Sequence, residues 1–185
     1  MADIWNAQQY MQFSTQRLRP AVDLLNQVHH DAPQYIYDLG CGPGNVTQLL
    51  QQRWPSATVF GIDNSQDMLE QARKAYATIQ WQHAVIENWK PEQPIDVIYS
   101  NAALHWVDHH NALLPRLISY LRTDGILAVQ MPHNYQSRAH LAIREIVNRG
   151  PWQHYLAPLL RFGGEDDAVS SPQYYYQLLS AHCRQ

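Results

Sequence analysis

The sequence predicts an α/β protein built on a doubly wound, mostly parallel sheet of five strands. Five short segments rich in β-branched and aromatic residues alternate with segments of helical periodicity. A glycine-rich turn also follows the first of these segments, which is typical of such sheets. Strands separated by helices of this length form parallel βαβ units with right-handed crossovers. We expect the 185 residues to form one domain.

The expected elements follow one another from a helical start. Residues 5–28 have helical character, and Pro20 is placed to begin a new helix because its fixed φ suits the first helical position. Ser65 is expected to cap a helix through its hydroxyl group. The expected strands are 34–39, 58–63, 79–85, 95–100 and 126–131. The expected helices after residue 30 are 45–53, 66–76, 109–121, 137–149, 155–161 and 173–182.

Composition narrows the functional classes. Thirteen Lys and Arg against sixteen Asp and Glu give a net charge of −3, and only 16% of the residues are charged. This balance argues against a surface that follows nucleic-acid phosphates. The 45% hydrophobic content argues against disorder, and no apolar run approaches the roughly 18 residues of a membrane span. We therefore expect a small-molecule partner, with no nucleic acid and no membrane.

Cysteine and histidine usage indicates the compartment and argues against a metal. Cys41 and Cys183 cannot build a disulfide framework, and the N-terminus has no basic stretch followed by an apolar one. Both features predict a cytoplasmic protein. Two pairs of adjacent histidines occur, but neighbours on a helix diverge by about 100° and cannot chelate one ion together. No metal site is expected.

The glycine-rich turn is the first feature that carries chemistry. The run Asp38-Leu39-Gly40-Cys41-Gly42-Pro43-Gly44 ends the first expected strand, where ligands bind in doubly wound sheets. Glycines let a ligand approach the backbone, and the helix that follows offers N–H groups to an anion. A dinucleotide fingerprint would need glycine at position 45, where this chain has Asn45. A nicotinamide-dependent oxidoreductase is therefore disfavoured.

Asp63 is the second such feature, because it ends the second expected strand. A carboxylate at this place can accept hydrogen bonds from the two hydroxyls of a ribose. The plainer alternative is a capping or turn aspartate. Together, the glycine turn and this acid at the adjacent strand end predict a ligand that contains adenosine.

The chain resembles the class I S-adenosylmethionine-dependent methyltransferases. The resemblance rests on the run Tyr37–Gly44, on Asp63 and on the stretch NAALHW at 101–106. The stretches WNAQQYMQF, QRWPSATVFGIDNS and LAVQMPHN further resemble family members that methylate trans-aconitate. The resemblance implies a Rossmann-like class I methyltransferase fold and S-adenosyl-L-methionine as the cofactor.

It also implies roles for matching residues. Asp38 and the backbone of the loop would bind the methionine end of the cofactor, and Gly44 would let the adenosyl group lie against the chain. Asp63 would bind the ribose, with Asn64 and Met68 near the adenine. Val85 stands where the family often has an acidic residue for the adenine amino group, so backbone groups or Glu87 would take that role. The implied cofactor-binding residues are Asp38, Gly40, Cys41, Gly42, Gly44, Asp63, Asn64, Met68, Asn101 and Ala102.

The implied reaction needs no metal and no catalytic side chain. A carboxylate acceptor is ionised at neutral pH and requires no general base, so catalysis consists of alignment and the exclusion of water. A small polycarboxylic acid such as trans-aconitate needs cationic partners, for which Arg17 and Arg19 are candidates. Tyr10 could cover the site as a lid, and His105 would lie close to the sulfonium. Each arginine has the alternative of a solvated charge on a helix.

Two further functions stay open at this point. The chain could methylate a carboxyl group of a malonyl thioester, as in biotin synthesis, or it could be a non-catalytic domain that binds S-adenosylmethionine. The second alternative arises because the implied fold has seven strands and only five are visible. Residues 1–30 would form an N-terminal helical cap, residues 34–131 the cofactor-binding core, and residues 132–185 a helical segment that is cut short. Strand 126–131 would then be an exposed edge through which the chain could self-associate.

Overall fold

The computed structural model describes residues 14–160 and 168–183, and the side chains from residue 18 onward. Residue contacts divide the chain into two compact units, Met1–Gln130 and Met131–Gln185. The first unit contains the sheet, and the second contains helices. The expectation of a single domain stays a prediction.

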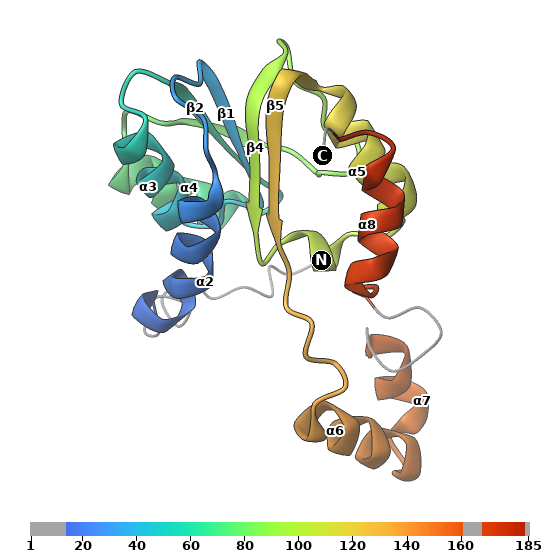
Figure 1. Cartoon of the computed structure of the whole chain (residues 1–185). Coiled ribbons are helices and arrows are strands. Elements are labelled where there is room, and N and C mark those ends of the chain that lie inside the picture. Colours follow the sequence, from blue (N-terminus) through green and yellow to red (C-terminus); the bar gives the residue numbers. More distant parts are fainter. Residues whose placement is uncertain (1–13, 161–167, 184–185) are drawn as a thin grey trace. The chain divides into compact units, whose positions relative to one another are not determined.

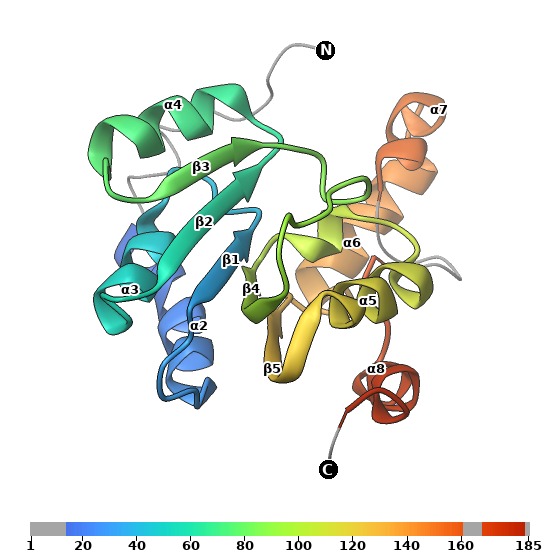
Figure 2. The same cartoon turned by 90° about the horizontal axis from the view of Figure 1, so that it is seen from above.

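The first unit confirms the doubly wound parallel sheet. The strands lie in the order β3-β2-β1-β4-β5, and every neighbouring pair is parallel (Figure 2). The strand order changes direction between β1 and β4, so the carboxyl ends of these two strands flank the switch point where ligands bind in such folds. The strands are β1 (Tyr35–Leu39), β2 (Thr58–Asp63), β3 (Gln80–His83), β4 (Ile95–Asn101) and β5 (Leu121–Gln130).

Helices cover both faces of this sheet. Helices α2 (Ser14–Gln27), α3 (Asn45–Arg53) and α4 (Gln66–Ala75) lie on one face, and α5 (His110–Ser119) lies on the other (Figure 1). A short 3-10 helix, η1 (Leu104–Trp106), follows β4. Apolar residues of α2 and α3 pack on the sheet and form the main core with Ile36, Leu50, Trp54, Val59, Val97 and Tyr99. The hydroxyl of Tyr99 donates to the Ala21 carbonyl at 2.6 Å, which ties α2 to β4.

Several boundaries differ from the sequence expectations; the third strand, for example, spans only Gln80–His83 where 79–85 was expected. Pro20 lies inside α2 and does not begin a new helix. The fifth strand begins at Leu121 because that residue already pairs with Ile95, and the ladder resumes only at Ile126. The four residues between form a bulge that contains Asp124 with φ +67°. The inserted residues break the alternation of side chains by which a strand is predicted from sequence, so the start of β5 was not predicted.

The second unit is helical where the structure describes it. It contains α6 (Arg138–Arg149), α7 (Gln153–Leu156), the 3-10 helix η2 (Ala157–Leu159) and α8 (Pro172–Ser180). Serine caps explain where two of these helices start: Ser137 accepts from the backbone N–H of His140, and Ser171 from that of Tyr174. Within residues 131–160 and 168–183 no strand occurs, so the described sheet has five strands. No helix of the described ranges has both the length and the apolar character of a membrane span.

Candidate functional site

The candidate site lies at the carboxyl ends of β1, β2 and β4. The loop Gly40–Gly44 leaves β1 there and leads into α3. Backbone N–H groups of Gly40 and Cys41 donate to the Ile62 carbonyl at 2.8 and 3.0 Å, so the loop is bound to the end of β2. The sequence expectation of a glycine turn at this edge of the sheet is confirmed.

Two glycines of the loop are required for different reasons. Gly40 has φ +74°, and a methyl group on it would lie 2.2 Å from the Cβ of Ala103, which follows β4. Gly42 has φ +54°, and a methyl group on it would meet nothing within 4 Å. Gly40 therefore lets two segments pack closely, whereas Gly42 faces open space that a ligand can fill.

Asp63 joins the loop to the start of α4. One carboxylate oxygen accepts from the N–H of Gly42 at 2.8 Å, and the other accepts from the N–H of Ser65 at 2.9 Å. Ser65 caps α4 as expected, because its hydroxyl accepts from the N–H of Met68. Asp63 is thus a structural turn residue, and a carboxylate can accept more than two hydrogen bonds. The structural and ligand-binding roles are compatible.

Asp38 forms the buried acidic floor of the site. Its side chain is only 2% exposed and accepts a 2.6 Å hydrogen bond from the hydroxyl of Thr47 on α3. The pKa of this carboxyl is raised to about 7, chiefly by burial; the hydrogen bond from Thr47 lowers it, and the nearby charge of Asp63 makes a smaller contribution that raises it. Near neutral pH the carboxyl therefore exists in both protonation states.

Cys41 is a buried thiol, not a nucleophile. Burial raises its pKa well above the ordinary value, and the carboxyl groups of Asp38 and Asp63 add to this shift. A thiol with a raised pKa stays protonated at neutral pH and is unreactive. Its small size suits the turn between β1 and α3.

The segment after β4 forms the second wall. Asn101 ends β4, and within the described part of the chain no group hydrogen-bonds to its buried Oδ1 atom. Ala102 follows with φ +51°, an uncommon conformation for a residue with a Cβ, and its N–H donates to the Gln130 carbonyl at 2.9 Å. A buried acceptor without a partner beside a strained residue indicates a place for a ligand donor.

His105 lies on η1, one turn beyond this wall. It is 9% exposed, and its ring lies 4.9 Å from the ring of Trp106, which is itself about half exposed. The ring of His110 holds η1 in place, since its Nε2 donates to the Leu104 carbonyl at 2.9 Å. The 3-10 turn thus presents an aromatic surface next to the end of β4.

The end of β3 forms the remaining boundary. Asp63 pairs in register with His83, whose Nε2 atom lies 3.0 Å from the Asn64 carbonyl. Met68 is buried beneath this region, and Val85 is 46% exposed. Asn64, Met68 and Val85 thus lie close to Asp63 in the chain or across the sheet, and the contact of Asn64 and Met68 with adenine stays a prediction.

Gly44 has a neighbour that sequence reasoning missed. A methyl group on it would lie 2.4 Å from Cη2 of Trp81 and 3.1 Å from Cδ2 of Tyr76. The space where a side chain of residue 44 would lie is therefore filled by aromatic side chains of the protein. This steric reason for glycine is separate from the expected contact with adenosine. Thr47 was also missed, although its position in the first turn after the glycine loop is a usable signal. Trp81 offered no comparable signal.

The structure describes the predicted acceptor residues only in part, and of these His105 is the one described beside the end of β4. Arg19 is exposed on α2, with its Nε atom 3.8 Å from a carboxylate oxygen of Asp23. Arg17 lies in α2, but its side chain is outside the described part. Tyr10 lies outside the described residues altogether. The roles of Arg17, Arg19, Tyr10 and His105 in binding the acceptor stay predictions.

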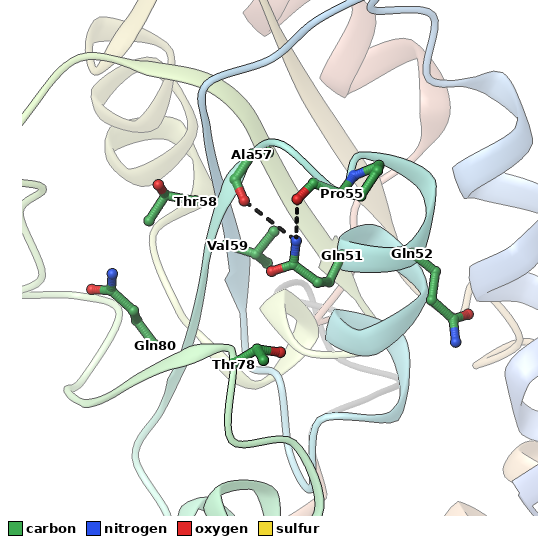
Figure 3. A pocket seen from close by; sticks show the side chains of 8 residues that line it. All are labelled: Gln51, Gln52, Pro55, Ala57, Thr58, Val59, Thr78 and Gln80. Carbon is green, nitrogen blue, oxygen red and sulfur yellow. Dashed lines mark hydrogen bonds between the residues drawn. The ribbon is translucent and has the colours of Figure 1, made fainter.

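A separate pocket lies at the opposite end of the strands. Thr58 begins β2 and Gln80 begins β3, and both line this pocket with Gln51 of α3 (Figure 3). The side-chain amide of Gln51 donates to the carbonyls of Pro55 and Ala57, so it is engaged within the protein (Figure 3). This pocket is at the amino ends of the strands and is distinct from the candidate site.

Comparisons with known proteins agree with this geometry. Residues 36–125 match the family model described as a methyltransferase domain. Trans-aconitate 2-methyltransferase of Azoarcus sp. (strain BH72) is 42% identical over 181 residues, which span 98% of this chain and 69% of that protein. The protein of the same name from Yersinia pestis (strain Pestoides F) is 44% identical over 178 residues, 96% of this chain and 68% of that protein.

Solved structures show the same fold. The plantazolicin methyltransferase BpumL, in complex with a pentazolic desmethylPZN analogue and S-adenosylhomocysteine, superposes with a TM-score of 0.65 at 19% identity. That match covers 95% of this chain and 67% of that one. An S-adenosylmethionine-dependent methyltransferase from Mesorhizobium loti matches with a TM-score of 0.56 and 27% identity, over 65% of this chain and 56% of that one. By the identity and coverage of its relatives, the chain belongs to the class I S-adenosylmethionine-dependent methyltransferases, in the family of the trans-aconitate 2-methyltransferases.

Proposed function

We propose that this chain transfers the methyl group of S-adenosylmethionine to a carboxylate of a small polycarboxylic acid such as trans-aconitate. The observation that carries the acceptor class is the 42% and 44% identity to relatives named trans-aconitate 2-methyltransferase. The site itself supports the cofactor, because its groups match the parts of S-adenosylmethionine.

The fit rests on three features. Asn101 Oδ1 is a buried acceptor with no partner in the described chain, which suits an ammonium donor. Gly42 borders open space, and Asp63 beside it can accept hydroxyl hydrogen bonds. The N–H groups of Gly40, Cys41 and Gly42 already donate within the protein, so the loop would bind the cofactor with its acceptor groups. This shifts the sequence expectation from an anion-binding to a cation-binding loop.

Each predicted residue then has a role. Asp38, Asn101, Ala102 and the loop Gly40–Gly44 would surround the methionine portion, with Cys41 as a buried part of the turn. Asp63 would bind the ribose hydroxyls, and Asn64 and Met68 would border the adenine. The ionised carboxylate of Asp38 would attract the ammonium and sulfonium groups of the cofactor. Charge interactions are strong there because the carboxylate is buried away from water.

The cofactor supplies an activated methyl group on a sulfonium. An acceptor carboxylate that attacked this methyl group would form a C–O bond as the C–S bond broke, giving a methyl ester and S-adenosylhomocysteine without proton transfer. The chain contributes orientation and water exclusion, which can account for about 7–11 kcal/mol of barrier. Arg17 and Arg19 would pair with acceptor carboxylates, His105 would lie beside the methyl group, and Tyr10 would cover the site.

The decisive experiment measures methyl transfer with a panel of acceptors. The chain is incubated with S-adenosylmethionine and trans-aconitate, a malonyl thioester or a monocarboxylic acid, and the methyl ester is quantified. We expect ester formation with trans-aconitate. Preferential methylation of the malonyl thioester would identify that thioester, and not trans-aconitate, as the acceptor. Tight cofactor binding without transfer to any acid would indicate a non-catalytic binding domain. Substituting Arg17 and Arg19 by Gln should raise the KM for the acceptor and leave cofactor affinity unchanged.

A further inference from the structure

One aromatic ring lies against two glycines, Gly61 in β2 and Gly44 at the end of the candidate-site loop. Trp81 lies in β3 and pairs in register with Gly61 of β2. Its Cζ3 and Cε3 atoms lie 2.3 and 2.4 Å from where a Cβ on Gly61 would be. Its Cη2 and Cζ2 atoms lie 2.4 and 3.1 Å from the same place on Gly44. The six-membered part of the indole therefore spans the distance from the sheet to the end of the glycine loop.

Hydrogen bonds hold this ring and its neighbour. The indole N–H of Trp81 donates to the Tyr76 carbonyl at 3.1 Å. The hydroxyl of Tyr76 donates to Oδ1 of Asn45, the first residue of α3, at 3.3 Å. Trp81 and Tyr76, here named the aromatic brace, thus connect β3 and the end of α4 to the point where the loop becomes a helix.

The brace accounts for the lack of a side chain at Gly61 and adds a steric reason for glycine at Gly44. Gly61 has an ordinary strand conformation, so its lack of a side chain is required by the indole and by the Sγ atom of Cys41, 2.9 Å from the same Cβ position. Gly44 has φ +88°, and as N-cap of α3 it provides no side-chain hydrogen bond. Asn45, which replaces the glycine of a dinucleotide fingerprint, binds Tyr76. The end of the loop is therefore held by tertiary contacts in place of a cap.

We infer that the aromatic brace positions the Gly40–Gly44 loop for the cofactor, with Trp81 as a positioning residue that does not touch the reacting atoms. This rests on the proposed binding of S-adenosylmethionine at the loop. Removal of the brace frees Gly44 and Asn45 to move, so the cofactor must order the loop when it binds. Ordering the loop would weaken the binding of the cofactor and leave the rate of the chemical step unchanged.

The sharpest variant is Trp81→Phe. Phenylalanine stays aromatic but lacks the atoms that contact Gly44. We expect the Kd for S-adenosylhomocysteine to rise about tenfold in calorimetry, and the KM for S-adenosylmethionine to rise likewise, with kcat at saturation within twofold. Tyr76→Phe removes one hydroxyl and should weaken binding about threefold.

Trp54→Phe is the matched control. Trp54 is buried in the same core, at the opposite end of α3, and its indole N–H also donates to one backbone carbonyl, that of His30, at 2.9 Å. It should lose a comparable amount of thermal stability while cofactor affinity stays within twofold. An equal loss of affinity in Trp54→Phe, or an unchanged Kd in Trp81→Phe, overturns the inference.

Hydrogen exchange separates this inference from the proposed function. In the free protein, the N–H of Gly44 bonds to the Cys41 carbonyl at 3.1 Å, and that of Gln48 to the Gly44 carbonyl at 2.9 Å. Trp81→Phe should speed exchange at both amides at least tenfold relative to Trp54→Phe. A wild-type chain that binds no S-adenosylhomocysteine contradicts the proposed function, whereas unchanged exchange contradicts the brace.

Discussion

The carboxylate of Asp63 accepts a 2.8 Å hydrogen bond from the backbone N–H of Gly42. This bond joins the end of β2 to the glycine loop that leaves β1, and the second oxygen of Asp63 binds the N–H of Ser65 at the start of α4. One side chain thereby orients two segments that surround the proposed ribose position. The acid is both a support of the loop and a candidate ligand group.

Asp63→Ala should lower the affinity for S-adenosylhomocysteine at least tenfold. The substitution removes the acceptor of two backbone N–H groups and the proposed ribose contact, and charge-assisted hydrogen bonds contribute about 1.5–3 kcal/mol each. Titration calorimetry measures the loss. Asp67→Asn, in the exposed first turn of α4, is the control that changes the same charge without touching the loop. Undiminished affinity in Asp63→Ala would remove this residue from the site.

Alanine substitutions at Gly40 and Gly42 should impair different properties: the first should lower stability, and the second should lower cofactor affinity. At Gly40 the new methyl group meets Ala103 at 2.2 Å in a positive-φ conformation, so the free energy of unfolding should fall by about 3 kcal/mol. At Gly42 only the φ strain of about 1 kcal/mol applies, because the methyl group meets nothing. That methyl group occupies the proposed cofactor space, so Gly42→Ala should lose affinity instead. Urea unfolding and calorimetry measure both quantities, and a Gly42→Ala variant with full affinity would place the cofactor elsewhere.

The stability of the free protein should fall as pH rises from about 4 to about 7. Burial raises the pKa of Asp38 from 3.8 to about 7, so in this window the folded state binds more protons than the unfolded state. The free energy of unfolding then decreases by up to about 1.4 kcal/mol per pH unit and levels off above pH 7. Asp38→Asn should abolish this part of the slope in urea titrations. Identical slopes in the variant and the wild type would show that the carboxyl is already ionised.

Cofactor affinity should depend on pH in the opposite sense. A cationic ligand is attracted by ionised Asp38, and below pH 7 the carboxyl must first lose its proton. The affinity for S-adenosylmethionine should therefore weaken as pH falls from 7 to 5, by up to about tenfold per unit. Calorimetry in buffers of different ionisation enthalpy measures the released proton. In Thr47→Val the loss of affinity should begin at a higher pH, because the hydroxyl that favours the ionised form of Asp38 is removed.

The edge of the sheet should promote association of the chain. Among the residues that the structure describes, β5 lies at one end of the strand order, and the backbone edge of such a strand can pair with another strand. Light scattering across a concentration series should show a mass that rises with concentration. A constant monomer mass would show that this edge is protected.

The order of strands and helices was predictable because it depends on short-range patterns. Alternating apolar segments, the glycine turn and the Ser65 cap each involve residues close in sequence, and the structure confirms all three. The bulge in β5 was missed because its residues do not follow the strand periodicity. The acceptor roles of Arg17, Arg19, Tyr10 and His105 stay predictions, because Tyr10 and the side chain of Arg17 lie outside the described residues and Arg19 is exposed on α2.

The sequence by itself thus determined the family, the parallel sheet and the place of the glycine loop and Asp63. Only the tertiary structure decided the burial that raises the pKa of Asp38, the hydrogen bonds of the loop N–H groups and the packing of Trp81 on Gly44. The physical reason is that each of these depends on burial or on a contact between residues far apart in the chain. Periodicity and spacing report on the residues next to a given residue in the sequence, whereas its pKa or its steric fit depends on the residues that surround it in space.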